Sequence, residues 1–367
     1  MTRSLFPETV ALLHDAVAAR VFPGGSFGVL RLGAAPINYV DAVGRFTYEA
    51  EASFVMPETI FDLASVTKVM ATTLAAMQAN ERGKLQLDKP LEEWLPSFRT
   101  AAPEDPRRAL VTPRMLLNHS SGLPGYGRLF EAAATRESMI ALAMRQPLTA
   151  HPGARAEYSD IGFILLGYLL ETIFGERLNV YCQRELFTPL GLTATCFCPP
   201  AALRSDIPPT EEDRSFRHRI LQGEVQDENA WAMGGIAGHA GLFANAADLL
   251  AVAACLLEGG VTRTGPRLFL PPTIERFACR SGQPAGTSRA LGWDTPSPPS
   301  SAGTLFSPRS IGHLGYAGTS LWIDLDAGVA AVLLTNRTWP DRSNQAIRGL
   351  RSRFHDSLRR ELAESSG

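Results

Sequence analysis

The sequence predicts an α/β (α+β) fold, in which an antiparallel sheet is flanked by helices from both ends of the chain. Two observations carry this prediction. Each end of the chain shows one helical pattern and one pair of strands, whereas the middle is mostly helical. A sheet buries its apolar faces against helices, so the economical arrangement places both ends in one sheet. The helical middle is then an inserted second domain, which the chain of 367 residues is long enough to contain.

The N-terminal part predicts a helix followed by a hairpin. Val10, Leu13 and Val17 recur at helical spacing, and a Pro-Gly-Gly triplet at 23–25 ends the pattern. The segments SFGVLRLG (26–33) and INYVDAVGR (37–45) alternate as strands do and are joined by a short turn.

The middle of the chain predicts several helices. Residues 66–80 have helical character, and Thr112-Pro113 is a good start for another helix because threonine caps and proline suits the first helical position. IGFILLGYLLETIF (161–174) is a third, strongly apolar helix. The inner face of the first of these helices is expected to contain Val69, Leu74 and Met77.

The C-terminal part predicts a second hairpin and a last helix. TSLWIDLDAGVAAVLLTNR (319–337) gives two strands around an Asp-Ala-Gly turn at 326–328, and residues 344–362 form an amphipathic helix. We therefore expect a discontinuous α/β domain from residues 1–75 and 225–367. A mainly helical domain would cover 76–224.

Composition excludes several classes of protein. With 45% hydrophobic and 20% charged residues and a net charge of -2, the chain is globular and offers no basic surface for nucleic acid. No apolar run approaches the roughly 18 residues of a membrane span. Glu8, His14 and Asp15 interrupt the first apolar segment, so it does not read as a signal peptide and we expect a cytoplasmic protein unless a leader is missing. The histidines form no HExxH and the five cysteines no zinc spacing, so no metal site is expected.

Lys68 raises the first question of chemistry. It is one of only three lysines in a chain that has 32 arginines, and it follows Ser65 by three residues. Residues three apart in a helix share a face, so the amine can reach the hydroxyl. A neutral lysine can accept the proton of a serine nucleophile, whereas arginine does not deprotonate. The alternative is a capping serine followed by a solvated lysine, and a single S-x-x-K does not decide between them.

Two further segments favour the catalytic interpretation. Tyr158-Ser159-Asp160 precedes the long apolar helix, where a loop can direct polar side chains into a site. His313-Leu314-Gly315 is expected at the entry to a strand, where a glycine lets substrate backbone lie close.

The three motifs in this order resemble the serine β-lactamase and penicillin-binding-protein superfamily. They are Ser65-Val66-Thr67-Lys68, Tyr158-Ser159-Asp160 and His313-Leu314-Gly315, and the likeness is closest to the class C branch, which includes D-peptidases, D-aminopeptidases and family VIII carboxylesterases. Supporting phrases extend the resemblance over most of the chain. They are TPRMLLNHSSGLPGY (112–126), NAWAMGGIAGHAGLFANAADL (229–249) and GHLGYAGTSLWID (312–324).

This resemblance implies a β-lactamase/transpeptidase-like fold with the active site in the cleft between the two domains, and it implies roles for individual residues. Ser65 would be the acylated nucleophile, Lys68 its base, and Tyr158 the group that relays a proton to the leaving atom. The backbone N–H groups of Ser65 and Tyr316 would hold the oxyanion, and His313, Gly315 and Asp160 would line the substrate site. No cofactor is implied.

Two positions depart from the family pattern. Asp160 stands where asparagine is usual; if it faces the site, its carboxylate would favour a charged Lys68 and repel anionic substrates. His313 stands where many β-lactamases have lysine, and with an ordinary pKa near 6.5 it would be a weak cation that holds a penicillin carboxylate poorly. Histidine here is familiar in D-peptidase and D-aminopeptidase relatives, so efficient β-lactam hydrolysis is not expected.

Weaker candidates are His119, His239 and the run 227–229, for which packing or a solvated loop is the simpler interpretation. The sequence thus predicts a serine hydrolase that acts through an acyl-enzyme on small ester, amide or D-amino-acid peptide substrates, as a carboxylesterase or a D-amino-acid peptidase. The alternatives are a β-lactamase or a penicillin-binding D-alanyl-D-alanine carboxypeptidase, and, from another class, a catalytically silent binding protein. The oligomeric state is left open.

Overall fold

The structure is a computed structural model that describes residues 4–133, 135–263 and 265–364. Its main sheet has five antiparallel strands in the order β2-β1-β10-β9-β8, so the N-terminal hairpin joins the C-terminal strands through the pairing of β1 with β10. The strands are β1 Gly24–Arg31, β2 Ile37–Gly44, β3 Phe61–Asp62, β4 Cys196–Phe197, β5 Glu211–Asp213, β6 Arg219–Leu221, β7 Leu242–Ala244, β8 Ile311–Leu314, β9 Ser320–Asp324 and β10 Val329–Thr335. The helices are α1 Pro7–Ala18, α2 Thr73–Glu81, α3 Pro96–Thr100, α4 Pro113–Leu117, α5 Arg136–Arg145, α6 Asp160–Phe174, α7 Leu178–Cys182, α8 Thr188–Leu190, α9 Glu228–Ala232, α10 Ala246–Leu257, α11 Pro271–Ala278 and α12 Ile347–Glu364.

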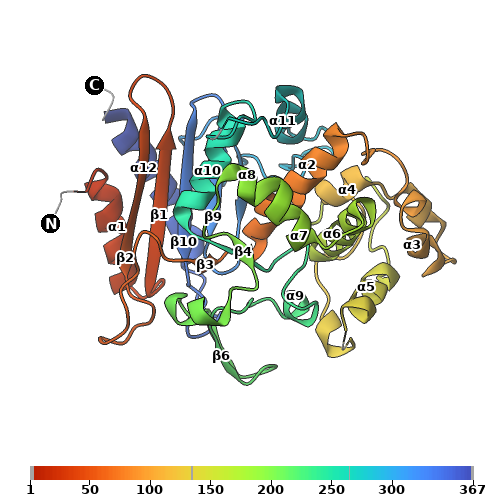
Figure 1. Ribbon diagram of the computed structural model, residues 1–367, viewed down its shortest axis with the longest axis horizontal. Helices are drawn as coiled ribbons and strands as arrows, with labels where there is room; N and C mark the ends of the chain where they lie inside the picture. Colours follow the sequence, from red (N-terminus) through yellow and green to blue (C-terminus); the bar gives the residue numbers. More distant parts are fainter. Residues whose placement is uncertain (1–3, 134, 264, 365–367) are drawn as a thin grey trace.

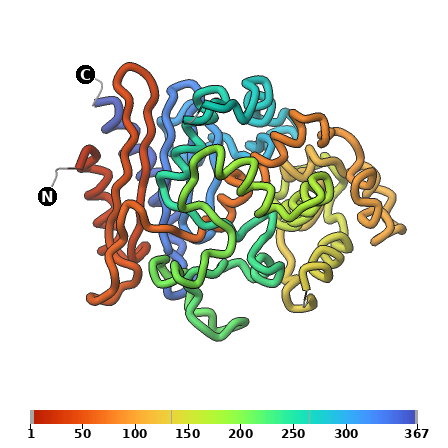
Figure 2. Tube along the Cα trace, in the orientation of Figure 1, coloured from red at the N-terminus to blue at the C-terminus, as the bar shows by residue number. Residues whose placement is uncertain are grey.

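The N- and C-terminal helices cover one face of the sheet together. In Figure 1, α1 and α12 lie on the same side of the strands, and Figure 2 shows these two chain ends running side by side. Leu13 of α1 and Phe354 of α12 are fully buried in one apolar cluster with Phe27 of β1. The predicted α/β (α+β) fold is confirmed by this arrangement.

The other face of the sheet carries α10 and, beyond it, the mainly helical region (Figure 1). Helix α10 packs closely on β1 because residue 28 is a glycine. A Cβ at Gly28 would lie 3.0 Å from the Leu250 side chain of α10. One continuous apolar core extends from this face of the sheet to Leu74 of α2 and Phe163 of α6. The division into residues 1–75 with 225–367 and residues 76–224 stays a prediction.

The helix that follows Ser65 differs from the expected amphipathic one. It begins with a π-helical turn, Lys68–Thr72, before α2, and every residue from Lys68 to Ala79 is buried, so it has no solvent face. It passes through the centre of the molecule between sheet and helical region, which explains its burial on all sides. The start at Thr112 is confirmed, since its hydroxyl accepts the Met115 N–H at the first turn of α4.

Two smaller sheets complete the fold, with strand orders β3-β7-β4 and β5-β6. The first of these positions the segment before Ser65, because β3 pairs with β7 and the Leu63 N–H donates to the Leu242 carbonyl at 2.9 Å. Within the described residues, no helix combines the length and apolar character that crossing a bilayer requires.

Candidate active site

Ser65 lies in a tight turn between β3 and the buried helix. The turn is a 3-10 turn, Ala64–Val66, and Ala64 has a φ of +47°, an uncommon backbone conformation for a residue with a side chain. Asp62 supports this turn: one carboxylate oxygen accepts the Ala64 N–H and the other the Gln226 N–H, both at 2.8 Å. Such strain persists only where the surroundings fix it, and here it presents the Ser65 side chain to the cleft.

Lys68 is the central cation of the site. It is fully buried, and its Nζ donates to Ser65 Oγ at 3.0 Å, to Asp160 Oδ1 at 2.7 Å and to the His239 carbonyl at 2.9 Å. An ammonium has three donors, and these three contacts use all of them. The expected meeting of the lysine amine with the serine hydroxyl is therefore present in the structure.

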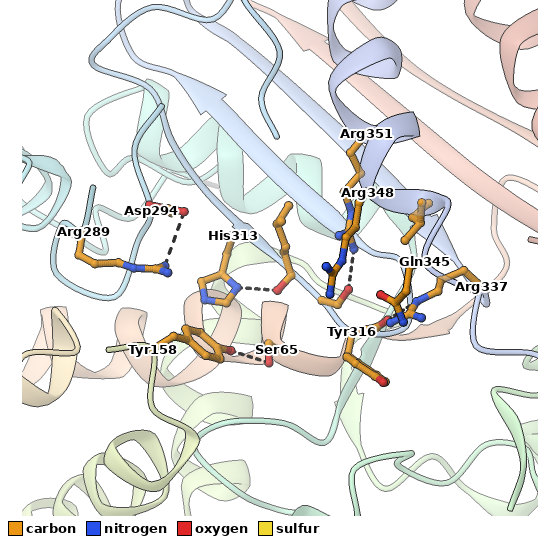
Figure 3. Close-up of a pocket in the computed structure, with 13 residues that line it drawn as sticks. Ser65, Tyr158, Arg289, Asp294, His313, Tyr316, Arg337, Gln345, Arg348 and Arg351 are labelled. Carbon is orange, nitrogen blue, oxygen red and sulfur yellow. Dashed lines mark hydrogen bonds and ion pairs between the residues drawn. The ribbon is translucent and has the colours of Figure 1, made fainter. Parts of the chain in front are cut away.

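Tyr158 and Asp160 reach the same point from the start of α6. Ser159 between them caps this helix, its Oγ accepting the Gly162 N–H at 2.9 Å. This cap fixes the two neighbouring side chains, of which Tyr158 places its Oη 2.7 Å from Ser65 Oγ. The sequence motif thus brings the Tyr158 hydroxyl to the serine (Figure 3) and the Asp160 carboxylate to the lysine.

The resting charges follow from burial and pairing. Burial lowers the pKa of the Lys68 ammonium, but attraction by Asp160 and Tyr158 outweighs it, so this pKa is raised and Lys68 is a cation at neutral pH. Burial also raises the pKa of Tyr158, against the opposing effect of Lys68, so its hydroxyl keeps its proton. Asp160 therefore faces the site and favours a charged Lys68. This effect was expected of an aspartate at the position where the family usually has asparagine.

The position and the charge of His313 both differ from what the sequence predicts. It does not lie at the entry to a strand but inside β8, an edge strand that the sequence patterns did not predict. Burial lowers its pKa well below 6.5, with Lys68 and Arg289 acting in the same direction, so it is neutral and not a weak cation. Its Nδ1 lies 2.8 Å from the Leu314 carbonyl, which can only accept, so Nδ1 carries the proton.

The structural reason for a glycine at position 315 differs from the predicted one. A Cβ at this position would lie 1.9 Å from Thr319 Oγ1 and 2.4 Å from the Leu63 carbonyl, so the protein itself occupies the space that was expected for substrate. The glycine lets the end of β8 pack against the turn that carries Ser65. Tyr316 follows it at the mouth of the cleft with 47% of its surface exposed. Within the described residues, the Tyr316 N–H donates to no protein acceptor and is available to an oxyanion.

Four arginines line the pocket on the β8 and α12 side of Ser65 (Figure 3). Arg289 pairs with Asp294 at 3.6 Å, whereas Arg337 and Arg351 donate to backbone carbonyls, which carry no net charge. In the described part of the chain no carboxylate pairs with Arg348. This half of the cleft is strongly basic. The four residues are Arg289, Arg337, Arg348 and Arg351.

Sequence reasoning missed these arginines, because they are far apart in the chain and were interpreted as scattered surface charges. One signal was present: Arg348 and Arg351 are three residues apart in the first turns of the predicted last helix. Cations are unfavourable at a helix N-terminus, so two of them on one face there indicate a ligand of opposite charge.

The other side of Ser65 is acidic. A second pocket there is lined by Asp160, Asp227 and Glu228, together with Tyr126 and Arg342. Burial would raise the pKa of Asp227, but His239 at 2.8 Å and the Ala230 N–H lower it to about 2, so this carboxylate is ionised. Glu228 shares Arg342 with Glu211, which leaves a net negative charge on the group.

The described residues contain no group of three His, Cys, Asp or Glu side chains arranged to hold a metal ion. The chemistry available at Ser65 is therefore that of a hydroxyl, an ammonium, a phenol and a carboxylate in mutual contact.

Comparisons with known proteins agree with this arrangement. The sequence model of the Beta-lactamase family matches residues 11–353. A protein of Escherichia coli (strain K12) named "Putative D-alanyl-D-alanine carboxypeptidase" is 33% identical over 306 residues, which are 76% of this chain and 69% of the relative. A penicillin-binding protein homologue from Caulobacter crescentus has the same fold, with a TM-score of 0.77 at 18% identity over 98% of each chain. A class C β-lactamase from Rhodobacter sphaeroides gives a TM-score of 0.72 at 20% identity, over 96% of this chain and 99% of its own.

Fold, site and family match together define a serine hydrolase. The chain belongs to the Beta-lactamase family, within the superfamily of serine β-lactamases and penicillin-binding proteins. The predicted family and enzyme class are thereby confirmed.

Proposed function

We propose that this serine hydrolase works through an acyl-enzyme formed on Ser65. The observation that carries the proposal is the convergence on Ser65 Oγ of Lys68 Nζ at 3.0 Å and Tyr158 Oη at 2.7 Å. A serine hydroxyl becomes nucleophilic when a neighbouring group takes its proton, and two groups that exchange protons are in contact with it.

The reaction then proceeds in two halves. In the first, Ser65 Oγ bonds to the substrate carbonyl carbon and gives up its proton to Lys68, while the N–H groups of Ser65 and Tyr316 hold the oxyanion. Tyr158 gives a proton to the leaving oxygen or nitrogen as its bond to the carbonyl carbon breaks. Lys68 then passes its proton to Tyr158, which restores both groups. In the second half, the oxygen of water bonds to the acyl carbon and gives a proton to Lys68. The bond from that carbon to Ser65 Oγ breaks, Ser65 Oγ takes the proton back, and the acid leaves. Because Lys68 rests as a cation, it must release one proton before it can accept that of Ser65.

The basic pocket supports a leaving portion that carries a carboxylate. Arg348 is exposed at the start of α12 and Arg351 lies one turn further on, so both charges meet at the pocket that contains Ser65. Burial, together with Arg337 and Arg348, lowers the pKa of Arg351 to about 9, and it remains a cation at neutral pH. These arginines supply the positive charge that a neutral His313 does not. We therefore favour a D-amino-acid peptidase of the carboxypeptidase type, in agreement with the name of the E. coli relative.

The acidic pocket supports an ammonium group on the acyl portion. In a peptide the acyl portion is N-terminal and the leaving portion C-terminal, so the opposite charges on the two sides of Ser65 orient a short peptide with free ends. Asp227 and Glu228 would face its amine, and Arg348 its carboxylate.

A second candidate, β-lactam binding, is favoured by the same arginines, because a penicillin also carries a carboxylate beside its scissile amide. Asp160 remains unfavourable to β-lactam binding, because its carboxylate stands at the position where the family usually has an amide donor. Hydrolysis of neutral esters is the third possibility and would need neither charged pocket.

Mass spectrometry of the intact protein tests the proposal. The protein is incubated with D-alanyl-D-alanine, its N-acetyl derivative, benzylpenicillin and 4-nitrophenyl acetate, and the adduct mass identifies the acyl group. We expect an adduct on Ser65 that is absent in Ser65→Ala, and steady release of D-alanine from the dipeptide. Full turnover by Ser65→Ala would refute the nucleophile. Failure of every acylating reagent, including a fluorophosphonate, would favour the silent binding protein.

A further inference from the structure

His119 lies just beyond α4 in a backbone conformation that histidine seldom adopts. Its φ is +61°, the Ser120 N–H donates to the Met115 carbonyl at 2.8 Å, and the His119 N–H donates to the Leu116 carbonyl at 3.4 Å. This pattern of bonds ends many helices, and its left-handed position is usually glycine or asparagine. A histidine there costs about 1 kcal/mol of strain, which points to a use for its side chain.

Two hydrogen bonds tie His119 to the segment that carries Tyr158. The Glu157 N–H donates to the His119 carbonyl at 2.8 Å, and the Ser159 N–H donates to its ring Nδ1 at 3.0 Å. The residues immediately before and after Tyr158 are thus both held by this one residue.

The imidazole of His119 also packs against the tyrosine ring itself. The two ring centroids are 4.8 Å apart, and the ring of Phe163, on α6, lies 5.1 Å away on the same imidazole. Only 2% of His119 is exposed, so the contact is protected from solvent. Backbone and ring contacts together fix both the position and the tilt of the Tyr158 side chain.

His119 is not itself placed to carry a proton to substrate. Its Nδ1 accepts an amide N–H and is therefore unprotonated, and burial, with Arg289 and Lys68, lowers its pKa well below 6.5. The ring is a neutral acceptor, which is the form that the bond to Ser159 requires.

We propose that His119 is a positioning residue that holds the Tyr158 hydroxyl against Ser65 Oγ. The inference rests on the proposed function, in which Tyr158 protonates the leaving atom. This role explains why a strained histidine occurs at the position that ends α4. It also gives the LLNHSSG segment a part in the reaction, although His119 lines neither pocket beside Ser65.

The test compares two leaving groups on one acyl group. 4-Nitrophenyl acetate releases a stable anion, whereas 2-phenylethyl acetate releases an alcohol that must be protonated as it departs. We expect His119→Ala to lower kcat/KM for the second ester about 30-fold more than for the first, within the range of general acid catalysis. His119→Asn keeps a short acceptor and tolerates a positive φ, so it should recover most of this difference. His355→Ala, which removes a buried imidazole elsewhere, should lower both esters equally or not at all.

A double variant decides whether the effect passes through the tyrosine. If His119 acts through Tyr158, adding His119→Ala to Tyr158→Phe should change kcat/KM by less than about twofold. Equal losses on both esters, or full additivity in the double variant, would overturn the proposal while leaving the acyl-enzyme intact. Lack of fluorophosphonate labelling in the wild-type protein would instead refute the proposed function, so the two failures are distinguishable.

Discussion

The two walls of the cleft differ in the charge that they present to Ser65. The wall from β8 and the start of α12 contributes Arg348 and Arg351, whereas the wall from α6 and α9 contributes Asp160 and Glu228. Among the described residues, Arg289 is the one arginine of the basic wall that pairs with a carboxylate, so this wall keeps most of its positive charge. The acidic wall pairs its carboxylates with Lys68, His239 and Arg342.

This difference indicates that the walls have different tasks. The acidic wall includes Asp160, which favours the charged form of Lys68, so a change there should alter the activity and its pH dependence. The four arginines of the basic wall touch no reacting atom, so a change to one of them should alter substrate binding.

Lys68→Arg should have the largest effect. Arginine keeps the positive charge opposite Asp160, so the fold should survive, but a guanidinium cannot take the proton of Ser65. We expect the rate of Ser65 labelling by a fluorophosphonate to fall about 10³-fold, within the range of general base catalysis. Lys84→Arg, at an exposed lysine, is the matched control. Labelling within tenfold of wild type would show that Lys68 is not the base.

Arg348→Ala should separate binding from chemistry on the basic wall. A hydrogen bond to a charged group contributes about 1.5 to 3 kcal/mol, so KM for D-alanyl-D-alanine should rise about 10- to 100-fold with a smaller change in kcat. kcat/KM for 4-nitrophenyl acetate, which has no carboxylate, should stay the same. The control is Arg353→Ala, an exposed arginine on the same helix. An equal loss on both substrates would contradict a carboxylate site.

Asp160→Asn should change how both activity and stability depend on pH. Without the carboxylate, burial dominates and the pKa of Lys68 falls below its ordinary value, so kcat/KM should begin to rise at lower pH than in wild type. In the wild-type protein the raised pKa of Lys68 contributes stability that is present below the unfolded pKa and is lost only as pH rises through the folded one.

The stability of the Asp160→Asn variant should have the opposite slope. Its unfolded state binds the Lys68 proton more tightly than its folded state, so the free energy of unfolding should increase with pH towards the unfolded pKa. At neutral pH we expect a loss of about 3 kcal/mol for the broken buried pair. Urea unfolding at several pH values measures this, with Asp206→Asn as an exposed control. A stability profile parallel to wild type would show that the pair does not control the charge of Lys68.

The sequence predicted the group around Ser65 better than the arginines of the basic wall, for a physical reason. Ser65, Lys68, Tyr158 and Asp160 occur in two short motifs, and the structure brings all four into hydrogen-bond contact as the motifs suggest. The arginines come from three separate segments of the chain, and only the folded chain shows that Arg337 and Arg351 donate to uncharged carbonyls.

Burial explains most of the remaining differences. The charge of His313 depends on its surroundings, which the pattern HLG does not reveal. Strand β8 has four residues with a glycine among them, so it is too short to show alternation, whereas the longer β1 and β10 were predicted to within two residues. The left-handed conformation of His119 could not be inferred from the sequence, because a left-handed position after a helix is usually marked by glycine and position 119 is a histidine.

Glu228→Gln should give the smallest effect and tests the acidic wall as a binding surface. Glu228 shares Arg342 with Glu211, so its loss removes one negative charge that is already partly balanced. A partly screened charge contributes about 1 kcal/mol, so kcat/KM for D-alanyl-D-alanine should fall about fivefold. The N-acetyl dipeptide has no ammonium group and should be unaffected. Both substrates should be unaffected in Glu212→Gln, which makes the same charge change at a half-exposed side chain that lines neither pocket beside Ser65. If both dipeptides lost activity equally, Glu228 would stabilise the wall and not recognise the amine, and the orientation of the substrate would then depend on the arginines alone.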